Sequence, residues 1–164
     1  MQQGGEALER VIERVNSQYP DADVSIVRKA AEYAMAMHEG QMRSSGDPYI
    51  THPLEVVNIL LDLEVDIPTI AAALLHDVVE DTEATYEDIQ REFSTEIAEL
   101  VDGVTKLTRM SCNSREEQQA ESLRKMMLAT ARDVRVIMIK LCDRLHNMRT
   151  LQVRPQDRQQ AKAK

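Results

Sequence analysis

Four titratable side chains stand beside the most apolar run of this sequence. The stretch TIAAALLHDVVEDT passes from alanines and leucines into His76, Asp77, Glu80 and Asp81. On a helix, residues four apart share a face, so His76 would lie next to Glu80 and Asp77 next to Asp81. Buried charges are costly unless they are paired or bound to a metal, and carboxylates on one face repel one another. The pattern therefore predicts a cation among these side chains.

A second polar stripe follows near the end of the chain. In KLCDRLHNMRTL, Asp143, His146, Asn147 and Thr150 fall at positions i, i+3, i+4 and i+7 of a predicted helix. We expect the opposite, apolar face to anchor that helix by packing, so that the polar stripe faces the first one. That apolar face is made of Ile137, Leu141, Leu145 and Met148.

A third source of ligands is His52, which the following Pro53 holds at a helix start. His52, His76, Asp77 and Asp143 form a set of two imidazoles and two carboxylates. Such a set suits Mn²⁺, Fe²⁺ or Zn²⁺ and leaves positions open for water and substrate. It favours a hydrolytic metal centre over a structural zinc.

Each part of this pattern also has an ordinary structural interpretation. A lone His-Asp dipeptide is common by chance, and a charged helix face is usually solvated. His38, near a predicted helix end before Gly40, is more typical of a capping or packing residue than of a ligand. His146 fits a supporting or a structural role equally well. The metal prediction depends on the joint occurrence of the dipeptide, the distant Asp143 and the His-Pro loop.

The composition and the positions of Gly and Pro predict an all-helical fold. The chain is 43% hydrophobic but only 3% aromatic, and its few Gly and Pro residues separate helix-like segments. Thr85 with Asp88 and Ser114 with Glu117 have the spacing of capping boxes. We expect one domain over 1–164, with its core at about 24–153 and a flexible tail at 154–164. The predicted helices are 6–17, 24–38, 53–63, 68–80, 85–93, 95–109, 115–131 and 133–149.

Charge and cysteine usage narrow the class of protein. A net charge of −8 does not attract nucleic acid or an anionic membrane. No signal peptide or membrane-spanning run is recognisable. Cys112 and Cys142 are too few for a disulfide framework, which favours a reducing compartment. We therefore expect a cytoplasmic protein with no nucleic-acid or membrane partner.

Four motifs, in order along about residues 24–153, resemble the hydrolase domain of the RelA/SpoT family, and its SpoT-like branch in particular: HEGQMRSSGDPYITHP, AALLHDVVEDT, GVTKL and IKLCDRLHNMRTL. The resemblance implies an HD-type helical fold that holds one Mn²⁺ through His52, His76, Asp77 and Asp143. It also implies hydrolysis of the 3′-pyrophosphate of the alarmones ppGpp and pppGpp. The products would be GDP or GTP and pyrophosphate.

The same resemblance assigns further roles. Glu80 and Asp81 match the catalytic acidic pair of the family, and Arg43 matches the residue that lies against the guanine base. The remaining substrate-binding positions would be Ser44 and Ser45 in the loop and Asn147 and Thr150 on the last helix. Many members carry Lys or Arg where this chain has Ser44, which bears on substrate affinity.

Two alternative functions remain beside this hypothesis, and the chain could be a fragment or a complete small enzyme. One alternative is a phosphohydrolase for another nucleotide, such as NADPH or a cyclic dinucleotide. The other is a regulatory module without activity, which the presence of every expected ligand disfavours.

The family usually continues into a synthetase domain, and nothing after residue 150 resembles one. We therefore expect either a fragment of a bifunctional synthetase/hydrolase or a small stand-alone hydrolase.

Overall fold

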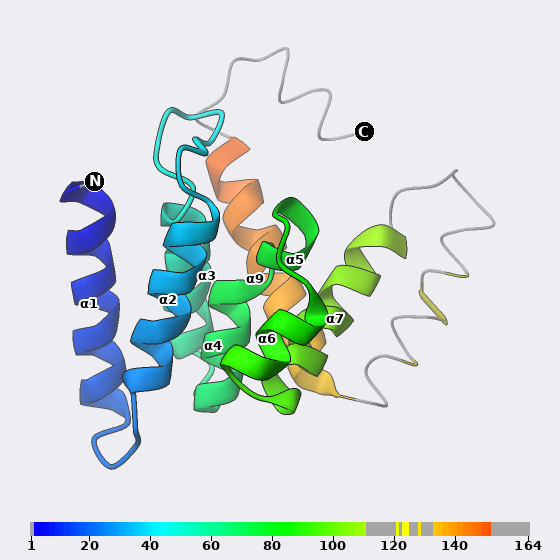
Figure 1. Ribbon diagram of the computed structural model, residues 1–164, viewed down its shortest axis with the longest axis horizontal. Coiled ribbons are helices and arrows are strands. Elements are labelled where there is room, and N and C mark those ends of the chain that lie inside the picture. The colour runs from blue at the N-terminus through cyan, green and yellow to red at the C-terminus, as the bar shows by residue number, and fades with distance from the viewer. Residues whose placement is uncertain (1, 111–120, 122, 125–127, 129–132, 152–164) are drawn as a thin grey trace.

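The computed structural model describes residues 2–110, 121, 123–124, 128 and 133–151. Within these ranges the chain is helical and forms no strand, apart from an isolated bridge between Met42 and Pro48. The predicted all-α fold is confirmed (Figure 1). The helices are α1 (Gln2–Gln18), α2 (Ser25–Met37), α3 (Thr51–Leu61), α4 (Ile67–Leu75), α5 (Val78–Asp81), α6 (Tyr86–Glu92), α7 (Thr95–Met110) and α9 (Val134–Leu151).

Helix α4 is the centre of the core. It packs against α2, α3, α7 and α9, and all its residues from Thr69 to Leu75 are buried. A helix that is apolar on every side must be surrounded by other helices. The run IAAALL thus explains why neighbouring helices converge where the polar residues of the HDVVED segment begin.

Helix starts follow the capping signals in the sequence. Asp66 precedes α4 and accepts a hydrogen bond from the Thr69 backbone N–H at 3.0 Å. The predicted capping box before α6 is confirmed: the Asp88 N–H donates to Thr85 Oγ1 at 3.2 Å, and the Thr85 N–H donates to Asp88 Oδ2 at 2.9 Å. These bonds satisfy N–H groups that have no partner within the helix.

The prediction of one helix over 68–80 is wrong, because the helix stops at His76 and Asp77. The backbone N–H of His76 donates to Ala73 O, three residues back, at 3.5 Å, and the His76 ring Nδ1 contacts the same oxygen at 2.5 Å. Two donors from one residue thus converge on that carbonyl where the regular ladder ends. Glu80 and Asp81 consequently lie on the one-turn helix α5, not on a continuation of α4.

For the last helix, the prediction that its polar stripe faces the first one is confirmed by the contact of Asp143 with His76, and the expected anchor Ile137 packs against the core. The prediction that the rest of the apolar face is buried is wrong. Leu141, Leu145 and Met148, the other expected anchors, are 58%, 41% and 63% exposed. The side of α9 that packs inward carries Val136, Ile139 and Cys142 together with Asp143, which is 6% exposed. The buried side of α9 is therefore the side that carries the polar stripe, because Asp143 must reach His52 of α3 and His76 at the end of α4.

Several predictions fall on parts of the chain that lie outside the described residues. They are the tail at 154–164, the capping box at 114 and 117, Cys112 and most of the helix at 115–131. Cys142 is a buried free cysteine in α9.

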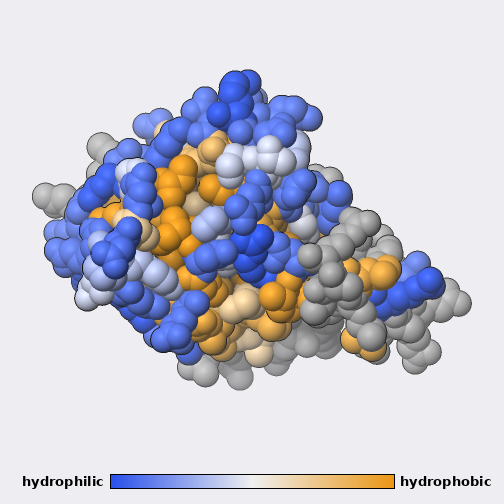
Figure 2. Space-filling view, turned by 90° about the horizontal axis from the view of Figure 1, so that it is seen from below, coloured by the Kyte–Doolittle hydropathy of each residue, from blue (hydrophilic) through white to orange (hydrophobic). Residues whose placement is uncertain are grey.

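The surface of the described part offers no membrane-crossing element. None of the helices in these ranges is long and apolar enough to span a bilayer. Seen from below, apolar residues gather between hydrophilic ones over the middle of one face (Figure 2). Because about 55–60% of a folded protein's surface is apolar in general, this area alone assigns no partner.

Gly103 of the GVTKL motif allows α7 and α9 to approach each other closely. A Cβ at this position would lie 2.8 Å from Cγ2 of the buried Val136. We expect Gly103→Ala to lower the free energy of unfolding by on the order of 1 kcal/mol, because overpacking outweighs the gain in helix propensity. Urea denaturation measures the change.

Gly5→Ala in α1 is the matched control, since a Cβ there meets nothing within 4 Å. It should leave stability unchanged or raise it by up to about 1 kcal/mol. Equal stabilisation by both substitutions would contradict the close contact.

Candidate metal centre

The four predicted ligands come together although they lie far apart in the sequence. His52 is in the first turn of α3, His76 and Asp77 form the break between α4 and α5, and Asp143 is in α9. One ligand atom from each residue lies within 4.8 Å of the others. His52, His76 and Asp143 are 4%, 2% and 6% exposed, and Asp77 is partly buried. We call these residues the metal group.

Asp143 is the hub of the metal group. Its Oδ1 lies 2.6 Å from Nε2 of His52 and 3.3 Å from Nε2 of His76. Its Oδ2 accepts a hydrogen bond from Lys140 Nζ at 3.4 Å, and the same ammonium donates to Thr108 Oγ1 at 2.8 Å. One carboxylate thus connects α3, α4 and α9.

The histidine rings are oriented by their other nitrogens. Nδ1 of His76 faces the Ala73 carbonyl and must donate to it, since a carbonyl only accepts. Nδ1 of His52 faces Nδ1 of His146 at 2.6 Å. Both Nε2 atoms therefore point to the shared carboxylate. A ligand histidine usually binds metal through one nitrogen while the other is held in this way.

The electrostatics keep both carboxylates ionised. Burial alone would raise the pKa of Asp143, but hydrogen bonds from His52 and His76 hold it well below the ordinary value. Burial likewise opposes ionisation of Asp77, yet the charge of His76 lowers its pKa to about 2. Burial would lower the pKa of His76, whereas Asp77 and Asp143 raise it well above the ordinary value. A divalent cation can take over the stabilising role of that imidazolium, so the group fits such an ion.

His146 connects the metal group to the predicted substrate residues. Its Nδ1 contacts His52 Nδ1 and lies 3.4 Å from Nη1 of Arg43, while Nη2 of Arg43 donates to Asn147 Oδ1 at 3.3 Å. Burial, and then the positive charges of His52 and Arg43, lower the pKa of His146 to about 4. A neutral His146 can accept one hydrogen bond at Nδ1, the atom that both His52 Nδ1 and Arg43 Nη1 face. Of its two predicted roles, this geometry fits support of a ligand.

The acidic pair lies beside the metal group. Glu80 and Asp81 are exposed on α5, directly after Asp77. The backbone N–H of Asp81 donates to Asp77 O at 2.9 Å. Burial of part of the side chain and the charge of Asp77 raise the pKa of Asp81. These carboxylates are open to solvent and to a ligand that approaches from outside.

The other predicted substrate residues are Ser44, Ser45 and Thr150, and the bonds of Ser45 and Thr150 are local. Ser44 and Ser45 are exposed, and Ser45 Oγ donates to Asp47 Oδ2 at 2.9 Å within their own loop. Thr150 is one turn beyond Asn147 and donates to its backbone carbonyl at 3.0 Å. Their contact with a nucleotide stays a prediction.

Tyr49 is a site residue that the sequence reasoning missed. Its hydroxyl donates to Asp77 Oδ2, and its ring stacks on His38 with centroids 3.8 Å apart. Burial and the charge of Asp77 raise the pKa of Tyr49, which keeps the phenol protonated. His38 itself caps α2 and is buried, so it packs, as expected. The available signal was position, because Tyr49 lies one helical turn before His52.

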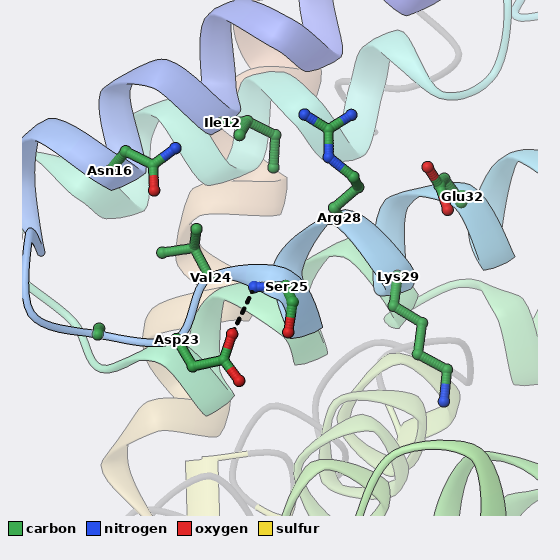
Figure 3. A pocket seen from close by; sticks show the side chains of 9 residues that line it. Ile12, Asn16, Asp23, Val24, Ser25, Arg28, Lys29 and Glu32 are labelled. Carbon is green, nitrogen blue, oxygen red and sulfur yellow. Dashed lines mark hydrogen bonds between the residues drawn. The ribbon is translucent and has the colours of Figure 1, made fainter.

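A separate hollow of about 500 Å³ lies between α1 and α2. Figure 3 shows Arg28 and Lys29 beside the acidic Asp23 and Glu32 on its wall. Arg28 is paired with Glu9, and Lys29 with Glu92. The hollow shares no residue with the metal group, and its mixed charges select no ligand class.

Comparison with known proteins agrees with this geometry. The HD domain family matches residues 30–164. The chain is an HD domain of the RelA/SpoT family. This HD domain is 51% identical over 148 residues to "GTP pyrophosphokinase rsh" of Brucella melitensis, covering 90% of this chain and 20% of the relative. It is 48% identical over 152 residues to "Bifunctional (p)ppGpp synthase/hydrolase SpoT" of Escherichia coli K12, covering 92% and 22%.

A solved structure is similar over most of both chains. It is described as a metazoan ortholog of SpoT that hydrolyzes ppGpp and plays a role in starvation responses. The similarity has a TM-score of 0.64 and 30% identity, and it covers 85% of this HD domain and 80% of that chain. In contrast, the HD domain spans about a fifth of the length of the curated relatives it matches. The predicted family is confirmed.

Removal of a metal-group side chain should abolish metal binding without unfolding the HD domain. In His76→Ala and Asp77→Ala, one of the four donors is lost, and we expect Mn²⁺ binding measured by isothermal titration calorimetry to disappear. Asp102→Ala is the control, because Asp102 pairs with Lys106 on the surface of α7. Full Mn²⁺ occupancy in Asp77→Ala would contradict the ligand assignment.

Proposed function

We propose that this HD domain hydrolyses the 3′-pyrophosphate of ppGpp and pppGpp, with Mn²⁺ in the metal group. The observation that carries the proposal is the group of two imidazoles and two carboxylates, three of them buried and Asp77 partly buried, whose ligand atoms lie within 4.8 Å of one another. The E. coli relative is named as a (p)ppGpp synthase/hydrolase, and the solved relative is described as hydrolyzing ppGpp. The products would be GDP or GTP and intact pyrophosphate.

The metal group provides the donors that such an ion needs. Nε2 of His52 and His76 and one oxygen each of Asp77 and Asp143 would hold it. When bound, Mn²⁺ would supply a Lewis acid and lower the pKa of a water molecule. The choice of manganese comes from the family resemblance, while the donor set also suits other first-row divalent ions.

Glu80 and Asp81 would handle protons. Cleavage between the ribose 3′ oxygen and phosphorus requires a proton to leave the attacking water and another to reach the departing 3′ oxygen. The carboxylates of α5 are exposed and follow Asp77 closely in the chain, which makes them the candidates for these two transfers.

Arg43, Asn147 and Thr150 would hold the nucleotide. Arg43 already donates to Asn147, so the loop and α9 meet where a base and ribose would bind. A guanidinium can stack on the face of a purine, while Ser44 and Ser45 offer hydroxyl groups at the same loop. The negative net charge of the domain makes such local cations necessary for a polyanionic substrate.

The reaction itself is tested by product analysis of ppGpp incubated with the HD domain and Mn²⁺. Phosphorus NMR should show GDP and intact pyrophosphate, and EDTA should stop the reaction until Mn²⁺ is restored. Orthophosphate as the first product would overturn the proposed cleavage site. No turnover of ppGpp, together with rapid dephosphorylation of NADPH, would assign the domain to another nucleotide.

Substitution of the acidic pair tests proton transfer. Glu80→Gln and Asp81→Asn should each lower kcat by about 100-fold or more, with Mn²⁺ still bound, because general acid–base catalysis contributes about that much. Glu83→Gln, a change of the same type at an exposed neighbouring position, should leave kcat unchanged. Unchanged kcat in both variants of the pair would reduce it to a solvated surface.

Arg43→Ala tests nucleotide binding. Loss of a stacking contact worth about 1–3 kcal/mol should raise KM and leave kcat nearly unchanged. Arg28→Ala is the control, since Arg28 pairs with Glu9 at the separate hollow. An unchanged KM in Arg43→Ala would exclude the stacking role.

A further inference from the structure

Tyr49 touches the metal group without belonging to it. Its hydroxyl donates to Oδ2 of Asp77, and this same oxygen lies 3.1 Å from Nε2 of His76. The direction of the bond is fixed, because an ionised carboxylate can only accept. One oxygen of Asp77 is thereby held between a phenol and an imidazole, which fixes how the carboxylate plane is turned.

The phenol is itself held firmly in place. Its ring stacks on His38 with an interplanar angle of 23°, and His38 Nδ1 contacts Gln41 Oε1 at 3.0 Å. The backbone N–H of Tyr49 donates to Gln41 O at 3.2 Å. His38 is 4% exposed, so the ring beneath the phenol is part of the core. These contacts therefore hold the Tyr49 side chain in one orientation.

Tyr49 also belongs to the loop that carries Arg43. The loop is closed by the bridge between Met42 and Pro48 and by the Arg43 N–H, which donates to Asp47 O at 2.8 Å. Its turn requires Gly46, which has φ +90°. At one end this loop reaches His146 through Arg43, and at the other end it reaches Asp77 through Tyr49.

We propose that Tyr49 is a positioning residue that orients the Asp77 carboxylate for a divalent cation and docks the Arg43 loop onto the metal group. This inference rests on the metal centre of the proposed function, not on the identity of the substrate. Outer hydrogen-bond partners of metal ligands typically contribute about 10- to 100-fold in metal affinity. Tyr49 should contribute within that range.

The test compares Tyr49→Phe with Tyr19→Phe by titration of the metal-free domain with Mn²⁺, with free Mn²⁺ followed by electron paramagnetic resonance. Both substitutions remove only a phenol oxygen, and Tyr19 also donates, to Val65 O, but away from the metal group. We expect Tyr49→Phe to weaken Mn²⁺ binding by about 10- to 100-fold and Tyr19→Phe to leave it unchanged. Circular dichroism confirms that each variant is folded at the temperature of the titration.

The outcomes separate this inference from the proposed function. Equal Mn²⁺ affinity in Tyr49→Phe and the unchanged domain would overturn the role of Tyr49 and leave the metal centre intact. Equal weakening in both Tyr variants would show a general loss of stability and would also overturn it. If the unchanged domain binds no Mn²⁺, the metal centre and this inference both fail. If Mn²⁺ binds and Tyr49→Phe weakens it, but ppGpp is not hydrolysed, the substrate proposal alone fails.

Discussion

A buried carboxylate shared by two imidazoles is the constraint on which the rest of this structure depends. Asp143 is 6% exposed and lies within hydrogen-bonding distance of His52 and His76. Without these partners, an ionised carboxylate at this depth would be strongly destabilising. Helices α3, α4 and α9 must therefore meet at one point, and α4 must end there so that His76, the residue that follows it, can turn toward the carboxylate.

This constraint explains the unusual orientation of α9. A helix normally buries its apolar face, but α9 leaves Leu141, Leu145 and Met148 exposed. Its inner face keeps Val136 and Ile139 for packing, while Gly103 of α7 leaves room for Val136. At the start of the helix, Arg135 is bonded to Asp66 and Glu96, which attaches α9 to the starts of α4 and α7. The packing of the helix thus follows the requirements of the site.

Sequence reasoning predicted the fold class and the residues that meet in the metal group, because both depend on patterns visible along the chain. An apolar run such as IAAALL must be buried, and His52, His76, Asp77 and Asp143 are the residue types that would need one another in a core. The break at His76 was not predictable in this way, since it depends on two donors that meet at the Ala73 carbonyl. Helical periodicity assumes a continuous ladder.

The exposure of most of the apolar face of α9 and the role of Tyr49 were missed for a related reason. Amphipathicity shows two faces but does not show which one is buried when the polar face carries buried ligands. In the sequence Tyr49 looks like an ordinary loop residue, because its contact with Asp77 is made only in the folded chain. Which face is buried and which residues support the site depend on contacts between distant segments, and the spacing of residues within one segment does not show such contacts.

The claim that the metal group is a divalent-cation centre is tested most directly by crystals of the HD domain grown with Mn²⁺ and measured at the manganese absorption edge. We expect one anomalous peak among Nε2 of His52, Nε2 of His76 and the carboxylates of Asp77 and Asp143, with metal–ligand distances of about 2.0–2.3 Å. A map without a peak there, or with the ion bound only by Glu80 and Asp81, would contradict it.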